Sequence, residues 1–339
     1  MQKIRLMALG GLDEDGKNMY LVEIDGDIFI VDCGLKYPSE SEQLGIEYII
    51  PDFTYLKDHK ERIKGLFISH GHDDVMSAIG HLLKEIDIEV YATALTAKLL
   101  NEELIKHGIN KKRINVIKRN ETLEVAGHKI KTFPVMQSIA DGVGFAFETE
   151  SGYIVYTSEF IFDYDIKNKA FSMDVNALSN LGQEGVLCLL SESTGSLRDG
   201  YTSPKHRISE YVEHYIENDN RVIITLYRQN LYRIIEILQL ASKYKKKVYF
   251  YDNEHIKLLK YVDELGYYSI PRDVIINSDF DNNDDNAIHV EEEDDEASSI
   301  DLEETGEFPE LGEKSRRSKE GSIINVGSKY DKVSVMISG

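Results

Sequence analysis

Cysteine is scarce in this sequence, and long apolar runs are missing. The two cysteines, Cys33 and Cys188, each lie inside an apolar stretch typical of a strand, which favours buried free thiols over a disulfide. Every apolar run falls short of the roughly 20 residues that a membrane-spanning helix requires. The first residues lead directly into a strand pattern and not into a signal peptide. We therefore expect a cytoplasmic protein with no membrane segment.

The sequence also lacks an even distribution of charge. Its formal net charge is −21, but residues 279–314 hold sixteen acidic residues against one lysine and contribute −15, which leaves −6 for the remainder. A block of like charge does not collapse into a core, so residues 279–321 are predicted to be a disordered acidic insertion. A folded body near neutrality can still present a basic groove to phosphates, so the acidic excess does not exclude RNA as a partner.

The most informative stretch runs from residue 65 to residue 83. A strand-like apolar run stops at Ser69, His70 and His72 follow at alternate positions of a loop, and Asp74 opens a helix-like apolar repeat. Two imidazoles and a carboxylate so close together, at the end of a buried strand, can converge on one divalent cation. The stretch therefore predicts a metal-binding turn.

The pattern of predicted elements changes once along the chain. Over residues 1–190, short strands joined by tight turns are interspersed with amphipathic helices, an order that fits an αββα sandwich. Over residues 191–339, helices and strands alternate with short connections, which predicts a mostly parallel sheet between helices. A length of 339 residues agrees with one large or two medium domains. We therefore expect a domain boundary near residue 190.

Several motifs resemble those of one protein family. After the strand the sequence reads His70-Gly71-His72-Asp73-Asp74-Val75, close to the H-x-H-x-D-H signature of the metallo-β-lactamase superfamily. Within that superfamily, the order of parts most resembles the β-CASP nucleases of the ribonuclease J family. The other segments that carry the resemblance are Ala8–Gly11, Gly16–Tyr20, Ile28–Leu35 and Gly45–Asp52.

The resemblance implies a fold, an activity and partners. The expected fold class is α/β: an incomplete metallo-β-lactamase αββα sandwich with an inserted α/β β-CASP domain built on a mostly parallel sheet. Family members are bacterial RNA exonucleases and endonucleases of mRNA decay and rRNA maturation, and they use two divalent cations, zinc or manganese. They assemble as homo- or hetero-oligomers through a C-terminal domain. Because the family chain continues past the point that matches Gly339, this sequence resembles the amino-terminal portion of a longer protein.

The resemblance also implies site residues. The metal-ligand positions of the family fall at His70, His72, Asp74, Gln137 and Glu159. Asp74 matches the ligand that also orients the attacking water, and Glu192 matches the first acid of the β-CASP domain. Asp74 and Glu192 are therefore the expected catalytic residues.

Several of these positions depart from the family pattern. Val75 and Gln137 each replace a histidine, and Glu159 and Glu192 each replace an aspartate. Cutting a phosphodiester at such a site depends on two cations about 3.5–4 Å apart, and zinc prefers about four close ligands with imidazole or thiolate among them. We therefore expect one weakly held metal or none, and vestigial catalytic residues.

The same departures decide the expected function. The pattern resembles the degenerate second paralogue of the family, which assembles with an active first one. The favoured function is an RNA-processing and decay protein with weak or absent nuclease activity that acts with a catalytic paralogue. The alternative is a competent metal-dependent 5′-to-3′ exoribonuclease or endoribonuclease that tolerates the substitutions. A thioesterase or lactonase is disfavoured by the α/β second half.

One segment of the second domain is a candidate RNA contact. Tyr227, Arg228 and Asn230 occupy the place where the family holds the RNA terminus, at the carboxyl end of a β-CASP strand. A guanidinium beside a tyrosine suits phosphate binding and base stacking. A plain strand-to-helix turn explains the same residues equally well.

Overall fold

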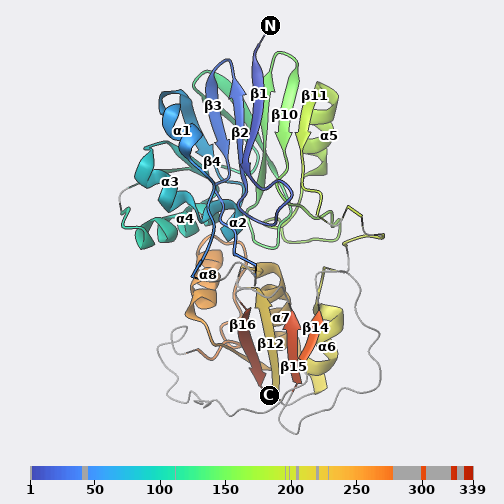
Figure 1. The fold of residues 1–339 in the computed structure, drawn as a ribbon. Helices are drawn as coiled ribbons and strands as arrows, with labels where there is room; N and C mark the ends of the chain where they lie inside the picture. The colour runs from blue at the N-terminus through green and yellow to red at the C-terminus, as the bar shows by residue number, and fades with distance from the viewer. Residues whose placement is uncertain are drawn as a thin grey trace. The chain divides into compact units, whose positions relative to one another are not determined.

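The computed structural model divides the chain into two compact units (Figure 1). It describes residues 2–39, 45–110, 112–194, 196–197, 199–203, 206–218, 221–227 and 229–277, and the backbone of residues 299–302, 322–326 and 332–338. The first unit is Met1–Thr194 and the second is Gly195–Gly339. No helix in these described ranges is long and apolar enough to span a membrane.

The first sheet of the first unit has six strands in sequence order. β1, β2 and β3 form an antiparallel meander, and the turn between β2 and β3 places Asp25 and Gly26 at φ angles of 51° and 98°, which match the twist of hairpin strands. β3 to β6 pair in parallel. The bounds are β1 Ile4–Gly10, β2 Met19–Ile24, β3 Asp27–Val31, β4 Ile63–Phe67, β5 Val90–Ala92 and β6 Ile114–Val116.

The second sheet has five strands in the order β11-β10-β9-β8-β7. Its neighbours are antiparallel except for β10 and β11, which are parallel because the helix α5 lies between them in the sequence and makes the crossover. The bounds are β7 Thr122–Val125, β8 His128–Pro134, β9 Val143–Thr149, β10 Gly152–Tyr156 and β11 Val186–Leu190.

The two sheets face each other, and helices cover their outer faces. The core between the sheets is aromatic and includes Phe29, Phe67, Phe145 and Phe147. Leu82 of α3 and Leu100 of α4 pack on the first sheet, while Leu181 of α5 packs on the second. The bounds are α1 Thr54–Asp58, the 3₁₀ helix Lys60–Arg62, α2 Asp73–Met76, α3 Ile79–Glu85, α4 Ala94–Lys106 and α5 Val175–Glu184. This is an αββα sandwich, so the expected fold class is confirmed for this unit.

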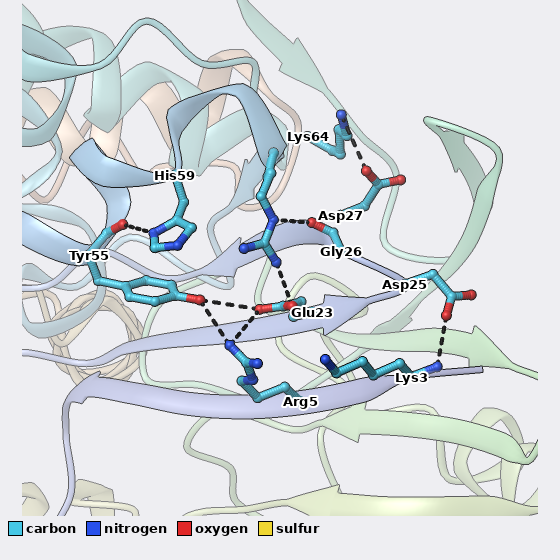
Figure 2. A network of polar contacts seen from close by, with 10 residues as sticks. Lys3, Arg5, Glu23, Asp25, Gly26, Asp27, Tyr55, His59 and Lys64 are labelled. Carbon is cyan, nitrogen blue, oxygen red and sulfur yellow. Dashed lines mark hydrogen bonds and ion pairs between the residues drawn. The ribbon is translucent and has the colours of Figure 1, made fainter. Parts of the chain in front are cut away.

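Charged side chains tie the segment that follows α1 to the first sheet (Figure 2). Glu23 of β2 accepts hydrogen bonds from Arg5 at 3.5 Å and from Tyr55 at 3.3 Å. Arg62 lies 2.5 Å from the other oxygen of Glu23, and it also donates to the carbonyl oxygen of Gly26 at 2.6 Å. Only 7% of Glu23 is exposed, and two guanidinium groups balance its charge.

The described residues of the second unit form a five-stranded sheet in the order β13-β16-β12-β15-β14 and three helices. β12, β15 and β14 are parallel, but β16 is antiparallel to β12 and β13. The expectation of a mostly parallel sheet is confirmed: β13, β12, β15 and β14 run in the same direction, and β16 is the reversed strand among those that the structure describes. Only residues 327–331 separate β15 from β16, and so short a connection reverses the chain instead of making a crossover. The bounds are α6 Ser209–Asn218, β12 Arg221–Tyr227, α7 Leu231–Lys243, β13 Lys247–Phe250, α8 Asn253–Glu264, β14 Ser299–Leu302, β15 Ser322–Val326 and β16 Lys332–Ser338.

The predicted acidic insertion, residues 279–321, falls almost entirely outside the described residues. The exception is Ser299–Leu302, which forms β14 and pairs with β15. The structure describes only the backbone of this short stretch, so the disorder of the insertion stays a prediction. Ile300 and Leu302 alternate with polar residues, as in a strand, and the charge averaged over the whole insertion concealed that alternation.

Candidate metal centre

The loop that carries the two histidines leaves the carboxyl end of β4 and is held by its main chain. The carbonyl oxygens of residues 73, 74 and 75 accept hydrogen bonds from the amides of Leu35, Asn18 and Cys33, at 3.0, 2.9 and 2.7 Å. Gly34 permits this close approach, because a Cβ at that position would lie 1.5 Å from the carbonyl oxygen of Asp74. The loop therefore has a fixed backbone before any ligand is considered.

The side chains of His70, His72 and Asp74 converge at this loop. Their ligand atoms all lie within 4.8 Å of one another, and His70 Nε2 is 3.0 Å from His72 Nδ1. His70 is fully buried and His72 is 7% exposed. Burial, and secondarily the neighbouring His72, hold the pKa of His70 well below its usual value. A neutral imidazole is the form that binds a metal, so the three residues form a possible site for one divalent cation.

The second nitrogen of each imidazole faces serine hydroxyl groups. His70 Nδ1 lies 3.0 Å from Ser69 Oγ and 3.5 Å from Ser158 Oγ. His72 Nε2 lies 3.1 Å from Ser138 Oγ. These contacts fix the orientation of both rings, as partners outside the ligand set do in metal sites.

Asp32 anchors the loop from the carboxyl end of β3. Its carboxylate accepts hydrogen bonds from the Ser69 amide at 2.8 Å, from Ser69 Oγ at 3.0 Å and from the Tyr156 hydroxyl at 2.6 Å. Complete burial raises the pKa of Asp32 to about 7, against the effect of these three donors. Its φ of 61° is unusual for a residue other than glycine, and the three hydrogen bonds hold the residue in that conformation.

Asp74 faces another carboxyl group. It hydrogen-bonds to Glu159, and it accepts from Asn18 Nδ2 at 3.1 Å. Loss of hydration raises the pKa of Asp74 to about 6. The charge of Asp74, then burial, then the charge of Glu192 raise the pKa of Glu159 well above its usual value. Glu192 accepts a hydrogen bond from the Phe160 amide at 3.2 Å. These carboxyl groups together favour a bound cation.

The structure shows the surroundings of two of the positions at which this chain departs from the family pattern, Gln137 and Val75. The side-chain amide of Gln137 donates a hydrogen bond to the carbonyl oxygen of Glu159, so it supports the segment that carries this acid. Val75 is fully buried, and its alkyl side chain has no atom that binds a metal.

The residues predicted to contact RNA belong to the second unit. Tyr227 ends β12, and Asn230 is the N-cap of α7, where its side chain accepts from the Arg233 amide at 3.3 Å. Asn230 is only 8% exposed, so the structure gives it a capping role that corresponds to the plain strand-to-helix turn. Arg228 lies outside the described residues.

Sequence reasoning assigned no role to the polar residues that surround the two imidazoles. The four that matter most come from separate segments: Asp32, Ser69, Ser138 and Ser158. A signal was present, since Asp32, Ser69 and Ser158 each come within two residues of the end of a strand, namely β3, β4 and β10. Polar residues at the ends of neighbouring buried strands are candidates for a shared network.

Comparison with known proteins places the chain in a family. Residues 12–137 match the metallo-beta-lactamase superfamily. Ribonuclease J 2 of Staphylococcus aureus (strain MRSA252) is 35% identical over 275 residues, which cover 80% of this chain and 49% of that protein. Ribonuclease J 2 of Staphylococcus epidermidis is 34% identical with the same coverage. These matches support the ribonuclease J family for this chain. It spans about half the length of the curated relatives it matches.

A solved structure shares the fold of this chain. It is a protein of unknown function from Enterococcus faecalis V583, with a TM-score of 0.56 and 13% sequence identity. The match covers 97% of this chain and 78% of that one. At this identity the likeness concerns the fold alone.

Proposed function

We propose that this ribonuclease J family protein takes part in RNA processing and decay, with weak or absent nuclease activity of its own, and that it acts beside a catalytic paralogue. The observation that supports the proposal most is the set of donor atoms at the His70 loop. Three ligand atoms converge within 4.8 Å of one another, which fits one divalent cation, zinc or manganese.

A second cation has too few donors around it. Cutting a phosphodiester with two cations requires both to be held about 3.5–4 Å apart. Beside Asp74, the nearest acid is Glu159, and the two carboxyl groups hydrogen-bond to each other. Val75 offers no ligand atom, and the Gln137 amide nitrogen is engaged by the Glu159 carbonyl oxygen. The residues therefore fit one cation better than two.

The chain's own residues would have distinct roles at this centre. His70 and His72 would hold the cation through Nε2 and Nδ1, the two nitrogens that face each other at 3.0 Å. Asp74 would complete the ligand set and orient a water molecule, and Glu192, which accepts a hydrogen bond from the Phe160 amide, would be the second catalytic acid. When bound, the cation would supply Lewis-acid chemistry to a phosphate group.

The remaining parts of the proposal concern domains and partners. We assign the first unit as the metallo-β-lactamase domain and the second as the β-CASP domain, with Tyr227 and Arg228 as contacts for the RNA terminus. The partner would be a catalytic ribonuclease J paralogue, joined in a homo- or hetero-oligomer in the cytoplasm. Identity of 35% to a protein named ribonuclease J 2 supports the assignment to RNA processing.

Metal content and nuclease activity, measured on the same purified sample, test the proposal. We expect at most one zinc or manganese ion per chain by elemental analysis. We also expect 5′-monophosphorylated RNA to be degraded at least about 100-fold more slowly than by the catalytic paralogue, because one of two cations is lacking. Two ions per chain and a rate equal to that of the paralogue would contradict the proposal.

A second candidate function is an active metal-dependent exoribonuclease or endoribonuclease. The carboxyl pair of Asp74 and Glu159 favours it, since manganese accepts oxygen ligands more readily than zinc does. Manganese-dependent cleavage of RNA that His72→Ala and Asp74→Ala both abolish would support this candidate and exclude the first.

A further inference from the structure

The loop that follows β10 presents aromatic rings to solvent. This aromatic loop, residues 160–172, begins directly after Glu159, and Phe160, Phe162 and Tyr164 stand at alternate positions in it. Phe162 is 41% exposed and Tyr164 is 81% exposed. A single exposed apolar residue is ordinary, but exposed rings close together in the sequence mark interaction sites more often. The metal centre described above gives these rings no role.

The first residues of the aromatic loop are tied to the candidate metal centre. Glu159 hydrogen-bonds to Asp74, and the next residue, Phe160, donates its amide hydrogen to Glu192 at 3.2 Å. The Ile161 amide donates to the main chain just after β8, also at 3.2 Å. The exposed rings therefore follow within a few residues of the acids at the centre, on a backbone held by hydrogen bonds.

The far end of the aromatic loop is held as well. The Arg119 guanidinium donates to the carbonyl oxygens of Lys169 and, at 2.6 Å, of Ser172. The amide of Asp141 donates to the carbonyl oxygen of Ala170 at 2.8 Å. Because both ends are fixed before a ligand arrives, little ordering of the backbone opposes binding to the rings between them.

One of the two exposed rings rests on a buried partner. The ring centroids of Phe160 and Phe162 lie 5.3 Å apart at an interplanar angle of 81°, an edge-to-face contact. Phe160 in turn packs against a core cluster that includes Phe133 and Leu181. The core thus supports Phe162 from below while part of its ring stays open to solvent, which suits a flat ligand that stacks on it.

The charge of the aromatic loop indicates how such a ligand is held. Asp163 and Asp165 balance Lys167 and Lys169, so residues 160–172 carry no formal net charge. Attraction to phosphate groups is therefore not the main contribution of this loop. Stacking of bases on aromatic side chains needs no net charge and accepts every base, because each base has a π face.

We propose that Phe162 and Tyr164 form a stacking platform for unpaired RNA bases beside the metal centre. Bases within a duplex are already stacked on each other, so the platform takes bases of single strands and of unpaired ends. The inference rests on RNA as the partner in the proposed function. It adds a base-binding subsite in the first unit, with Phe160 as the residue that supports it.

RNA affinity of the full chain tests the platform. The probe is a single strand of about 10 adenosines, within the size range of single-stranded sites, and EDTA prevents metal-dependent cleavage. Phe162→Ala and Tyr164→Ala should each lower the affinity about 10-fold, a typical effect of losing one stacked base. The factor should be similar at low and at high salt, since stacking releases no counterions. Ile105→Ala, at an exposed position of α4, is the control and should leave the affinity unchanged.

Conservative variants separate stacking from simple apolar contact. Tyr164→Phe keeps the ring and should keep the affinity of the wild-type chain. Phe162→Leu keeps an apolar side chain without a π face and should bind as weakly as Phe162→Ala. Equal affinity in the two alanine variants and the wild-type chain, or full affinity in Phe162→Leu, would overturn the inference.

An abasic strand with the same number of phosphates tests the ligand group directly. The wild-type chain should bind it at least about 10-fold more weakly than the adenosine strand, because no base is present to stack. Phe162→Ala should not weaken this binding further. If Phe162→Ala weakens the binding of both strands equally, the loop contacts the RNA backbone and stacking is excluded.

A fluorescent reporter can be placed on the platform itself. The sequence contains no tryptophan, so Tyr164→Trp introduces a single one. Its emission should be quenched by the adenosine strand and not by the abasic strand, since a base stacked on the indole causes the quenching. An emission that neither strand changes would contradict the assignment of Tyr164.

The two proposals fail in different ways. If the wild-type chain binds neither strand, RNA as the partner fails, and the platform fails with it. If the wild-type chain binds RNA and the alanine variants bind it equally well, the proposed function stands and only the stacking platform is excluded.

Discussion

Two groups of acidic side chains in the first unit have opposite surroundings. Glu23 lies between the guanidinium groups of Arg5 and Arg62, and Figure 2 shows its contact with Arg5. Asp74 instead hydrogen-bonds to Glu159, and the charge of Asp74 is the largest cause of the raised pKa of that acid. The first carboxylate has counter-charges from two arginines, whereas no salt bridge to the second pair is found among the residues that the structure describes.

This difference separates a structural network from a functional one. A carboxylate paired with arginine stabilises the connection between α1 and the first sheet, and it has no need of a ligand. Two carboxyl groups held together beside neutral imidazoles are unfavourable unless a proton or a cation lies among them. The same residue type therefore has a structural role at position 23 and a binding role at position 74.

The largest expected effect is on metal affinity. Asp74→Asn keeps the size of the side chain but removes its charge, so zinc affinity should fall at least about 100-fold. Glu23→Gln, the matched control in the paired network, should leave zinc affinity unchanged. Isothermal titration of both variants measures the contrast, and equal losses would remove the distinction between the two groups.

The next largest effect is expected from placing histidine at positions 75 and 137, where this chain lacks the metal ligands of the family pattern. Val75→His together with Gln137→His should add a second bound zinc ion per chain and raise the rate of RNA cleavage about 10-fold or more. Val75→Asn, a polar change without an imidazole, is the control for burying a polar group at this fully buried position. Metal content, cleavage rate and unfolding are measured together. A folded double variant with no extra metal would show that these two positions do not limit the site.

For the free energy of unfolding, the two positions should exchange roles: the change at Glu23 should matter, and the change at Asp74 should not lower stability. Glu23→Ala leaves the guanidinium groups of Arg5 and Arg62 unpaired, and the free energy of unfolding should fall by about 2 kcal/mol, less than for a fully buried pair because both arginines are partly exposed. Asp74→Asn in the metal-free chain should leave the stability unchanged or raise it, since it relieves the contact with Glu159. Urea unfolding decides between these directions, with Glu124→Ala on an exposed position as control.

Glu236 of α7 is intermediate between these two cases, because it is buried but accepts a hydrogen bond from a main-chain amide. Its substitution should have the smallest effect on stability. Burial is the main cause that raises its pKa, and its carboxylate accepts from the Ile208 amide at 3.1 Å. Because the pKa is higher in the folded chain than in the unfolded one, the stability that comes from protonating Glu236 is lost as the pH rises through the folded pKa. Glu236→Gln should therefore flatten the fall in unfolding free energy that begins above about pH 4. An unchanged slope in a pH series of urea unfolding would exclude this contribution.

The fold of the first unit followed from sequence patterns, while details of the second did not. Alternating apolar residues and tight turns such as Asp25-Gly26 predicted the strands of the sandwich. The direction of β16 could not be read in this way, because apolar alternation is the same for parallel and antiparallel strands. Only the pairing of β16 with β12 and β13 shows that the sheet is mixed.

The sequence by itself determined which residues of the candidate centre can bind a metal. It also determined that one ligand position of the family pattern is lost. His70, His72 and Asp74 stand within one short loop, so local chain geometry brings them together, and Val75 excludes a ligand at its position whatever the fold. The tertiary structure decided everything that depends on distant segments. Asp32, Ser138 and Ser158 reach the two imidazoles only because the ends of separate strands meet there. Burial, which lowers the pKa of His70 and raises the pKa of Asp74, is a property of that assembled surrounding and of no single stretch of sequence.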